Sequence, residues 1–163
     1  IFVIQWSMVV SHHERFVIRP FQPTDQEAAK NLVLSGLAER FNPFKPELNT
    51  DVNDIAKNFS VFLVAYKGHE LIATGGLKFE TKTSAKVVRM STMKAYRRLG
   101  LAGAILEELE LIARSQGITR LTLVTSKDWT EAVHFYERHG FSLLEHYLDE
   151  TGFQGVRFGK DLL

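Results

Sequence analysis

Cysteine is absent from the 163-residue sequence, and this absence excludes several classes of chemistry at once. Without thiols the chain can form no disulfide framework, no thiolate metal site and no cysteine nucleophile. The six histidines show no spacing typical of ligands, so no metal site is expected either. The lack of disulfides is typical of a reducing compartment, and we expect a cytoplasmic protein, with a secreted protein free of cysteine as the alternative.

An excess of charge of either sign is also missing, because 20 basic residues stand against 19 acidic ones and leave a formal net charge of +1. A strongly basic surface is the usual sign of binding to nucleic acid or to anionic membranes. We therefore expect neither partner for this chain. The 45% of hydrophobic and 24% of charged residues are typical of an ordinary globular domain.

The apolar stretch at the N-terminus, residues 1–10, is interrupted by two polar residues. It is too short to cross a bilayer, which needs about 20 apolar residues, and it lacks the basic flank of a signal peptide. We interpret residues 1–15 as an N-terminal extension, in part of vector origin, with Met8 as a candidate native start. The length of the chain favours a single domain over residues 16–163.

The hydrophobic periodicity alternates between the patterns of helices and of strands. Thr24 with Glu27, and Asp128 with Glu131, have the spacing of capping pairs at helix starts. The expected order is a strand at 16–20, helices at 24–42 and 51–58, strands at 61–66, 71–79 and 86–92, a helix at 101–116, a strand at 121–125, a helix at 129–139, and strands at 141–148 and 155–159. Hairpins combined with crossovers predict a mixed α/β sheet of about six to seven strands with four helices.

The most informative segment joins the predicted strand at 86–92 to the predicted helix at 101–116. Small residues at 100 and 102–104 let a ligand approach the backbone closely. The first amides of a helix have no partner within it, and together with the helix dipole they attract anions. Arg97 and Arg98 add positive charge at the same place. The segment suits a pyrophosphate, and the alternative is a tight turn with a cationic surface.

Two other phosphate-binding motifs fit this segment less well. A Walker loop ends in Gly-Lys-Ser/Thr, which is missing here. A dinucleotide fingerprint requires Gly-x-Gly-x-x-Gly early in the chain, with an acidic residue about 20 positions later. The glycines of this segment do not match that spacing.

Two motifs follow each other in this region, Arg97-x-x-Gly100-x-Ala102 and Ala132-Val-His-Phe-Tyr136-Glu-Arg-His-Gly140-Phe141. They resemble the two signatures of the GNAT superfamily of N-acetyltransferases, Arg/Gln-x-x-Gly-x-Gly/Ala and Ala-x-x-Phe-Tyr-x-x-x-Gly-Phe. The resemblance covers roughly residues 16–160 and is most specific over 86–141. It implies the acyl-CoA N-acyltransferase fold. It also implies an enzyme that transfers the acetyl group of acetyl-CoA to a primary amine by direct attack in a ternary complex.

The resemblance further implies how acetyl-CoA is held. Backbone groups at the end of the strand would pair with the pantetheine arm, the amides of the loop would hold the pyrophosphate, and Arg97 would pair with phosphate. Trp129 stands where relatives often have Asn, and it either stacks on the cofactor or anchors the helix by packing. The expected cofactor-binding residues are Met90, Ser91, Thr92, Arg97, Arg98, Leu99, Gly100, Leu101, Ala102, Gly103, Ala104, Trp129, Ala132 and Phe135.

Tyr136 resembles the family's general acid. A phenol with a pKa near 10 is protonated at neutral pH and can donate its proton to the sulfur of the leaving coenzyme A. The alternative is that Tyr136, at helical spacing from Ala132 and next to Phe135, only packs in the core.

The general base is less clear, because Lys86 occupies the position where many relatives carry Glu. A charged Lys cannot accept a proton. The substitutes are Glu80 in the preceding turn, which we take as the tentative base, His134 on the late helix, or a water held by strand carbonyls.

The acceptor is expected to be a small-molecule or peptide amine, selected by residues 34–58 and by the final hairpin. Glu39, Glu47, Asp51 and Asp54 could attract a cationic amine, and surface solvation explains these acids equally well. Domains of this fold often pair through their late strands, which favours a homodimer.

Two other functions compete with that of an acetyltransferase. Lys86 at the expected base position is compatible with a non-catalytic acyl-CoA-binding sensor or partner module on the same fold. The cationic loop alone is compatible with a nucleotide-binding protein unrelated to acyl transfer. Turnover with an amine would exclude the first, and the second predicts stabilisation by ATP or NAD.

Overall fold

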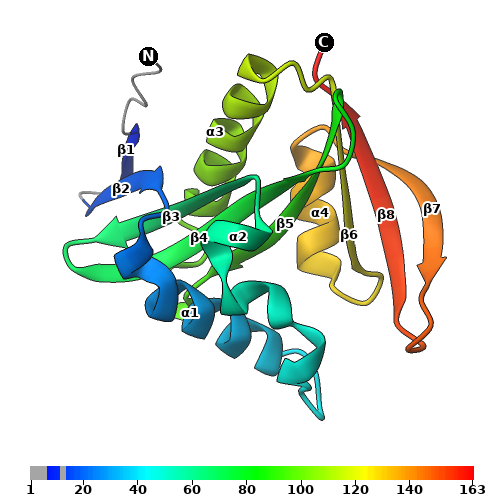
Figure 1. Ribbon diagram of the computed structural model, residues 1–163, viewed down its shortest axis with the longest axis horizontal. Helices are drawn as coiled ribbons and strands as arrows, with labels where there is room; N and C mark the ends of the chain where they lie inside the picture. Colours follow the sequence, from blue (N-terminus) through cyan, green and yellow to red (C-terminus); the bar gives the residue numbers. More distant parts are fainter. Residues whose placement is uncertain (1–6, 12–13) are drawn as a thin grey trace. The chain divides into compact units, whose positions relative to one another are not determined.

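The computed structural model describes residues 7–11 and 14–163, in which strands and four α-helices alternate (Figure 1). The strands form one hydrogen-bonded order, β1-β2-β3-β4-β5-β6-β8-β7. Their bounds are β1 (Ser7–Ser11), β2 (Glu14–Pro20), β3 (Val61–Lys67), β4 (Glu70–Phe79), β5 (Ser84–Thr92), β6 (Arg120–Ser126), β7 (Ser142–Leu148) and β8 (Gln154–Asp161). The α-helices are α1 (Gln26–Ala38), α2 (Ile55–Asn58), α3 (Leu101–Ser115) and α4 (Thr130–Arg138). The predicted mixed α/β fold class is confirmed.

One strand exceeds the six to seven expected, and it lies in the predicted N-terminal extension. Residues 7–11 form β1, which pairs with β2 in an antiparallel hairpin from Ser7 opposite Ile18 to Ser11 opposite Glu14. The remaining part of the prediction for the extension, residues 1–6 and 12–13, lies outside the described residues.

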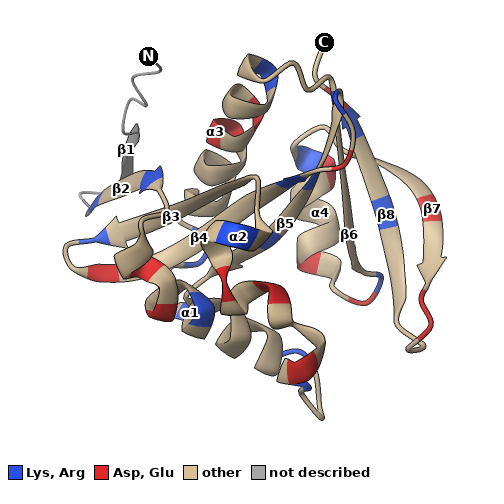
Figure 2. Cartoon of the chain, viewed as in Figure 1, with Lys and Arg blue, Asp and Glu red and all other residues tan. Residues whose placement is uncertain are grey.

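The chain divides into two compact units. The first contains the described residues up to Lys78 together with Val88–Leu111, and the second contains Phe79–Val87 and Ile112–Leu163. Strand β5 and helix α3 therefore contribute residues to both units. Acidic and basic positions are interspersed along the strands and helices of each unit (Figure 2), in agreement with the small net charge.

Strand β4 is the buried centre of the first unit, since every residue from 71 to 77 is buried. Consecutive residues of a strand point to opposite faces of the sheet. Gly75 faces α3, because a Cβ atom there would lie 2.6 Å from Cγ2 of Ile105. Gly76 faces the other side, where a Cβ atom would lie 3.0 Å from the ring of Phe62. The first unit therefore has helices on both faces of its sheet.

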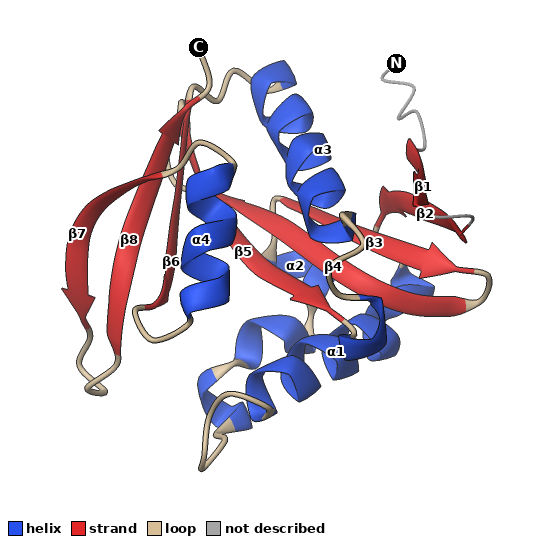
Figure 3. Cartoon of the chain, turned by 180° about the vertical axis from the view of Figure 1, so that it is seen from behind, coloured by secondary structure: helices blue, strands red, loops and turns tan. Residues whose placement is uncertain are grey.

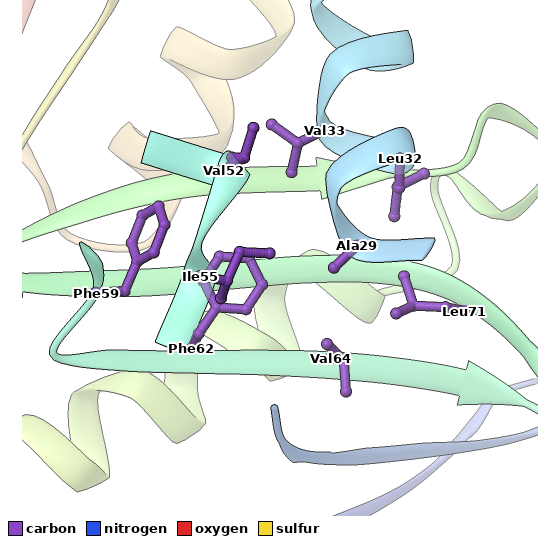
Figure 4. Packing of buried hydrophobic residues seen from close by; sticks show 9 residues of the cluster. All are labelled: Ala29, Leu32, Val33, Val52, Ile55, Phe59, Phe62, Val64 and Leu71. Atoms are coloured by element: carbon purple, nitrogen blue, oxygen red, sulfur yellow. The ribbon is translucent and has the colours of Figure 1, made fainter. Parts of the chain in front are cut away.

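One hydrophobic core cluster of the first unit lies on the face of β3 and β4 that α1 covers (Figure 4). Helix α1 contributes its apolar stripe at helical spacing, and the short segment after it adds residues of a 3-10 turn and of α2. The buried members are Ala29, Leu32, Val33, Val52, Ile55, Phe59, Phe62, Val64 and Leu71. This cluster fixes residues 50–59 against the sheet, next to the strand that carries the candidate site.

A buried ion pair lies at the start of α1. The carboxylate of Asp25, 1% exposed, accepts two hydrogen bonds from the guanidinium of Arg19, at 2.6 and 2.8 Å, and one from the hydroxyl of Tyr66 at 2.6 Å. The N–H of Gln22 donates a fourth at 2.8 Å. Burial alone would raise the pKa of Asp25, but these hydrogen bonds and the charge of Arg19 outweigh it and hold the pKa below its usual value.

The second unit is organised around β6. Residues 120–122 of β6 pair in parallel with residues 84–86 of β5, and the other edge of β6 pairs antiparallel with β8 along its whole length. Strand β7 then pairs with β8. Helix α4 lies alongside β6 (Figure 3). Leu121, Leu123 and Phe158 are buried in this unit together with Tyr136 of α4.

The capping residues predicted for two helix starts were wrong. A 3-10 turn, Pro23–Asp25, precedes α1, and the cap there is the bond from the Gln22 N–H to Asp25 rather than a Thr24–Glu27 pair. Helix α4 begins after Trp129, which makes no side-chain cap, so Asp128 does not cap it. The predicted helix at 51–58 is divided into a 3-10 turn, Thr50–Asn53, and α2, whose cap is Asp54.

We expect the substitution Gly75→Ala to lower the free energy of unfolding by about 1–3 kcal/mol, because the added methyl group overpacks the contact between β4 and α3. Its Cβ would lie 2.5 Å from the sulfur of Met90 as well as close to Ile105. Urea unfolding measures the effect. Gly36→Ala is the control, since that Cβ would lie 3.9 Å from Ser91 and alanine favours the helix; equal losses in both variants would contradict the packing argument.

No helix within residues 7–11 and 14–163 is long and apolar enough to span a bilayer.

Candidate active site

The backbone of strand β5 is kinked at Arg89, whose φ of 52° is rare for a residue with a side chain. The carbonyl of Arg89 accepts a hydrogen bond from the hydroxyl of Thr74 at 2.9 Å, which stabilises the kink. Beyond it, Met90 lies towards Gly75, and Ser91 lies 3.9 Å from where Gly36 of α1 would carry a Cβ. A kink of this kind redirects the following backbone, as a β-bulge does.

The side chain of Arg89 is bound by the segment between α1 and α2. Its Nε and Nη2 donate to the carboxylate of Asp51 at 3.1 and 2.6 Å, and its Nη1 donates to the side chain of Asn49 at 3.1 Å. Lys78 adds a contact of 3.3 Å to Asp51. Burial would raise the pKa of Asp51, but Arg89 and then Lys78 hold it below the usual value. Asp51 is therefore neutralised internally and does not serve as a free attractor for a cationic amine.

The loop after β5 turns sharply into α3. Arg98 and Gly100 both have positive φ, 65° and 81°, and no atom lies within 4 Å of where Gly100 would carry a Cβ. The N–H of Ala104 makes the first bond of the helix, to the carbonyl of Gly100 at 3.1 Å. The three preceding amides, of Leu101, Ala102 and Gly103, have no acceptor within the helix. The open space beside Gly100 is thus next to amides that the helix itself does not bind.

Arg97 has two partners within the first unit. Its Nε donates to the carbonyl of Thr92 at 3.0 Å, and its Nη2 donates to the carboxylate of Glu39 at 2.9 Å. Glu39 follows directly after the last residue of α1. The guanidinium predicted to pair with phosphate is thus engaged with the end of β5 and the end of α1.

In the second unit, Tyr136 is the buried residue of α4, with 8% of its surface exposed. Its ring contacts those of Phe135 and Phe141 edge to face, with centroids 5.1 and 5.6 Å apart. Burial raises the pKa of Tyr136 well above its ordinary value, so the phenol remains protonated at physiological pH. Such a group can donate a hydrogen bond and cannot act as a base.

The C-terminal end of α4 is fixed by β8. Gly140 takes a φ of 86°, and the ammonium of Lys160 donates to the carbonyl of His139 at 2.7 Å. A cation at this end of a helix also interacts favourably with the helix dipole. At the other end, the N–H of Trp129 donates to the carbonyl of Ser126 at 3.1 Å. Ala132 and Phe135, both half-buried, lie between these two anchored ends.

Glu80, the tentative base, is an exposed residue of the turn before β5. Its carboxylate accepts a hydrogen bond from the hydroxyl of Thr122 at 3.4 Å, and its N–H donates to the carbonyl of Ser84 at 2.9 Å. Lys86 is half-buried. It lies opposite Thr122, at the last residue pair of the parallel ladder between β5 and β6. Among the described residues, no three His, Asp or Glu side chains are grouped as metal ligands.

Comparison with known proteins supplies the family. A family model described as the acetyltransferase (GNAT) family matches residues 30–141, which is more than two thirds of the chain. The chain belongs to the GNAT acetyltransferase family. The matched residues include the kinked strand, the loop before α3 and all of α4.

Relatives of this GNAT protein carry names of the same class. It is 29% identical over 110 residues to the uncharacterized N-acetyltransferase YjcF of Bacillus subtilis. The aligned residues make up 66% of this chain and 75% of that protein. It is 31% identical over 91 residues to an uncharacterized acetyltransferase of Streptococcus pyogenes, so that 56% of this chain and 61% of that relative are matched. The match to the streptococcal relative thus spans about three fifths of its length.

Solved structures share the fold of this GNAT protein. An acetyltransferase of the GNAT family from Staphylococcus aureus matches with a TM-score of 0.82 and 20% identity, over 91% of this chain and 99% of that one. An aminoglycoside 6'-N-acetyltransferase solved as a complex with coenzyme A matches with a TM-score of 0.74 and 15% identity, over 90% and 97% of the two chains.

The predicted site residues of this GNAT protein are divided between its two units. The first unit brings together the end of β5, the loop and the start of α3, which hold the predicted residues 90–92 and 97–104. The second unit contains Glu80, the alternative base His134, Trp129, and Ala132, Phe135 and Tyr136 of α4. Sequence reasoning missed the partners of Arg89 and Arg97. The only signal for them was an excess of acidic residues in the segment after α1.

Proposed function

We propose that this GNAT protein is an acetyl-CoA-dependent N-acetyltransferase that acts on a primary amine of a small molecule or peptide. The observation that carries the proposal is the sharp loop at Gly100, with open space beside it, at the start of α3, where the first bond within the helix is made by the N–H of Ala104. A helix start of this kind favours a pyrophosphate. The complex of a protein of the same fold with coenzyme A supports the choice of ligand.

The residues of the first unit fit acetyl-CoA in two respects. The amides from Arg98 to Ala104 would hold the pyrophosphate, and the absence of a side chain at Gly100 leaves room for it. Backbone groups of residues 90–92, beyond the kink at Arg89, would pair with the pantetheine arm. In the second unit, the residues proposed to contact the cofactor are Trp129, just before α4, and Ala132 and Phe135 of α4.

The proposed reaction is direct attack of the neutral amine on the thioester carbonyl. A C–N bond forms, the C–S bond breaks, the attacking nitrogen loses a proton and the thiolate of coenzyme A gains one. Tyr136 is the proposed donor to the sulfur, because its raised pKa keeps it protonated. Glu80 is the proposed acceptor of the amine proton, with His134 and a bound water as the alternatives.

A second candidate is a non-catalytic acyl-CoA-binding module, favoured by Lys86 at the position where relatives often have a base. Turnover of acetyl-CoA with any member of a broad panel of amines would exclude this candidate. Tight binding without turnover across the panel would favour it.

The test is a thermal-shift titration of the wild type and of Gly100→Glu with acetyl-CoA, CoA, ATP and NAD. At about 100 times its dissociation constant, a ligand stabilises the fold by about 2.7 kcal/mol. We expect this shift with acetyl-CoA and CoA only, and we expect Gly100→Glu to abolish it, because a carboxylate then fills the space beside the helix amides.

Gly68→Glu is the matched control for Gly100→Glu. Gly68 also has a positive φ, 58°, and no atom within 4 Å of its missing Cβ, but it lies in the turn between β3 and β4. Backbone strain should therefore be similar in the two variants, and only Gly100→Glu should lose the shift. No shift of the wild type with either form of CoA would reject the proposed function, and equal shifts with ATP or NAD would favour a nucleotide-binding protein.

A further inference from the structure

The guanidinium of Arg97 connects three elements of the first unit. It starts from the loop before α3, donates to the carbonyl of Thr92 at the end of β5, and binds the carboxylate of Glu39 after the end of α1. Both side chains of the ion pair are partly exposed, 31% for Arg97 and 42% for Glu39. Arg97 thus joins the loop to a helix that is separated from it by 58 residues of sequence.

The charge of Glu39 argues against Arg97 as a simple phosphate ligand. A site for a polyanion gains from isolated positive charge, whereas a carboxylate at 2.9 Å from the guanidinium cancels that charge and repels phosphate. The same contact has a clear structural use. The loop contains two residues with positive φ, Arg98 and Gly100, and such a backbone persists only when its surroundings fix it.

A second ion pair joins strand β5 to the segment that follows α1. Arg89, at the kink of β5, binds Asp51 and Asn49 of the segment that follows α1. The strand and loop proposed to bind acetyl-CoA are therefore tied at two points to the segment between Glu39 and Asp51. Any change in the position of that segment is transmitted to them by short, directional hydrogen bonds.

We propose that Arg97 is a positioning residue of the acyl-CoA site, and that Glu39 sets the affinity for acyl-CoA through it. The pair holds the loop so that its amides are aligned before the pyrophosphate arrives, which reduces the cost of ordering them on binding. This inference rests on the proposed function, because it concerns the affinity for the same ligand. It makes an acidic residue favourable for binding a polyanion, which is the opposite of what charge alone predicts.

Isothermal titration calorimetry of Glu39→Gln with CoA tests whether the loss of this carboxylate weakens or tightens binding. If Arg97 positions the loop, Glu39→Gln weakens binding by up to about fivefold, the upper end of the range for an exposed ion pair. If Arg97 binds phosphate directly, Glu39→Gln releases it and tightens binding. Glu47→Gln is the control, since it removes the same charge from an exposed position of the following 3-10 turn and should leave the affinity unchanged.

Two further variants separate positioning from direct binding. Arg97→Lys keeps the positive charge but loses the paired donors to Thr92 and Glu39, so a positioning role predicts weakening similar to that of Arg97→Gln, and direct binding predicts retention. In a double-mutant cycle, Arg97→Gln with Glu39→Gln should bind CoA no more weakly than Arg97→Gln alone, because Glu39 acts only through Arg97. Thermal unfolding without ligand verifies that each variant is folded.

The possible outcomes distinguish this inference from the proposed function. Binding of CoA by the wild type, combined with unchanged or tighter binding by Glu39→Gln, would overturn the positioning role alone. Additive losses in the cycle would do the same. Failure of the wild type to bind CoA would overturn both the inference and the proposed function.

Discussion

Replacing Asp25 by alanine is expected to lower the free energy of unfolding by about 3–5 kcal/mol, the range for breaking a buried ion pair. The variant leaves the guanidinium of Arg19, whose side chain is 13% exposed, without the carboxylate that accepts two of its hydrogen bonds. It also removes the acceptor of the partly buried hydroxyl of Tyr66. Urea unfolding at neutral pH measures the loss.

The same carboxylate should make the protein sensitive to acid. Its pKa is lower in the folded protein than in the unfolded chain, so its stabilising effect is fully present above the unfolded value of about 3.9 and disappears as the pH falls through the folded value. The stability of the wild type should therefore fall as the pH is lowered from about 4. Asp25→Asn should show a smaller dependence on pH over the same range.

Two variants control for the loss at Asp25. Glu27→Gln changes an exposed carboxylate in the first turn of the same helix and should change stability by less than about 0.5 kcal/mol. Tyr66→Phe removes one of the four hydrogen bonds to Asp25 and should cost about 1–2 kcal/mol. A loss in Asp25→Ala no larger than that in Glu27→Gln would show that the ion pair does not stabilise the fold.

The elements that could be predicted from the sequence are those with strong periodicity and clear ends. Helix α3 was expected at 101–116 and is Leu101–Ser115, because its apolar stripe has helical spacing and Gly117 follows it. The sharp turn at its start was also predictable, since it depends only on local backbone and small residues. Gly100 could be identified because a tight turn into a helix needs a positive φ.

What could not be predicted depends on contacts between distant residues. The partner of Arg97 is 58 positions away and that of Arg89 is 38 positions away, and no local pattern pairs them. The start of α1 was missed for a similar reason, since Asp25 is held by Arg19 and by Tyr66 of a different strand. Tertiary hydrogen bonds of this kind override local capping signals.

Replacing Tyr136 by phenylalanine is expected to lower kcat by about 100-fold, at the lower end of the range for general acid catalysis. The change removes only the hydroxyl and retains the ring contacts with Phe135 and Phe141. Because the hydroxyl would act on the leaving sulfur and not on the ground state, the KM for acetyl-CoA should change little. Release of free thiol from acetyl-CoA, with the best acceptor of an amine panel, measures kcat.

Burial gives this prediction a pH signature. The raised pKa of Tyr136 means that the wild type should show no loss of activity from deprotonation of this phenol up to about pH 10, the ordinary value for tyrosine. Tyr147→Phe, on β7 of the same unit, is the control and should retain full activity. Equal kcat in Tyr136→Phe and the wild type would assign Tyr136 to packing alone.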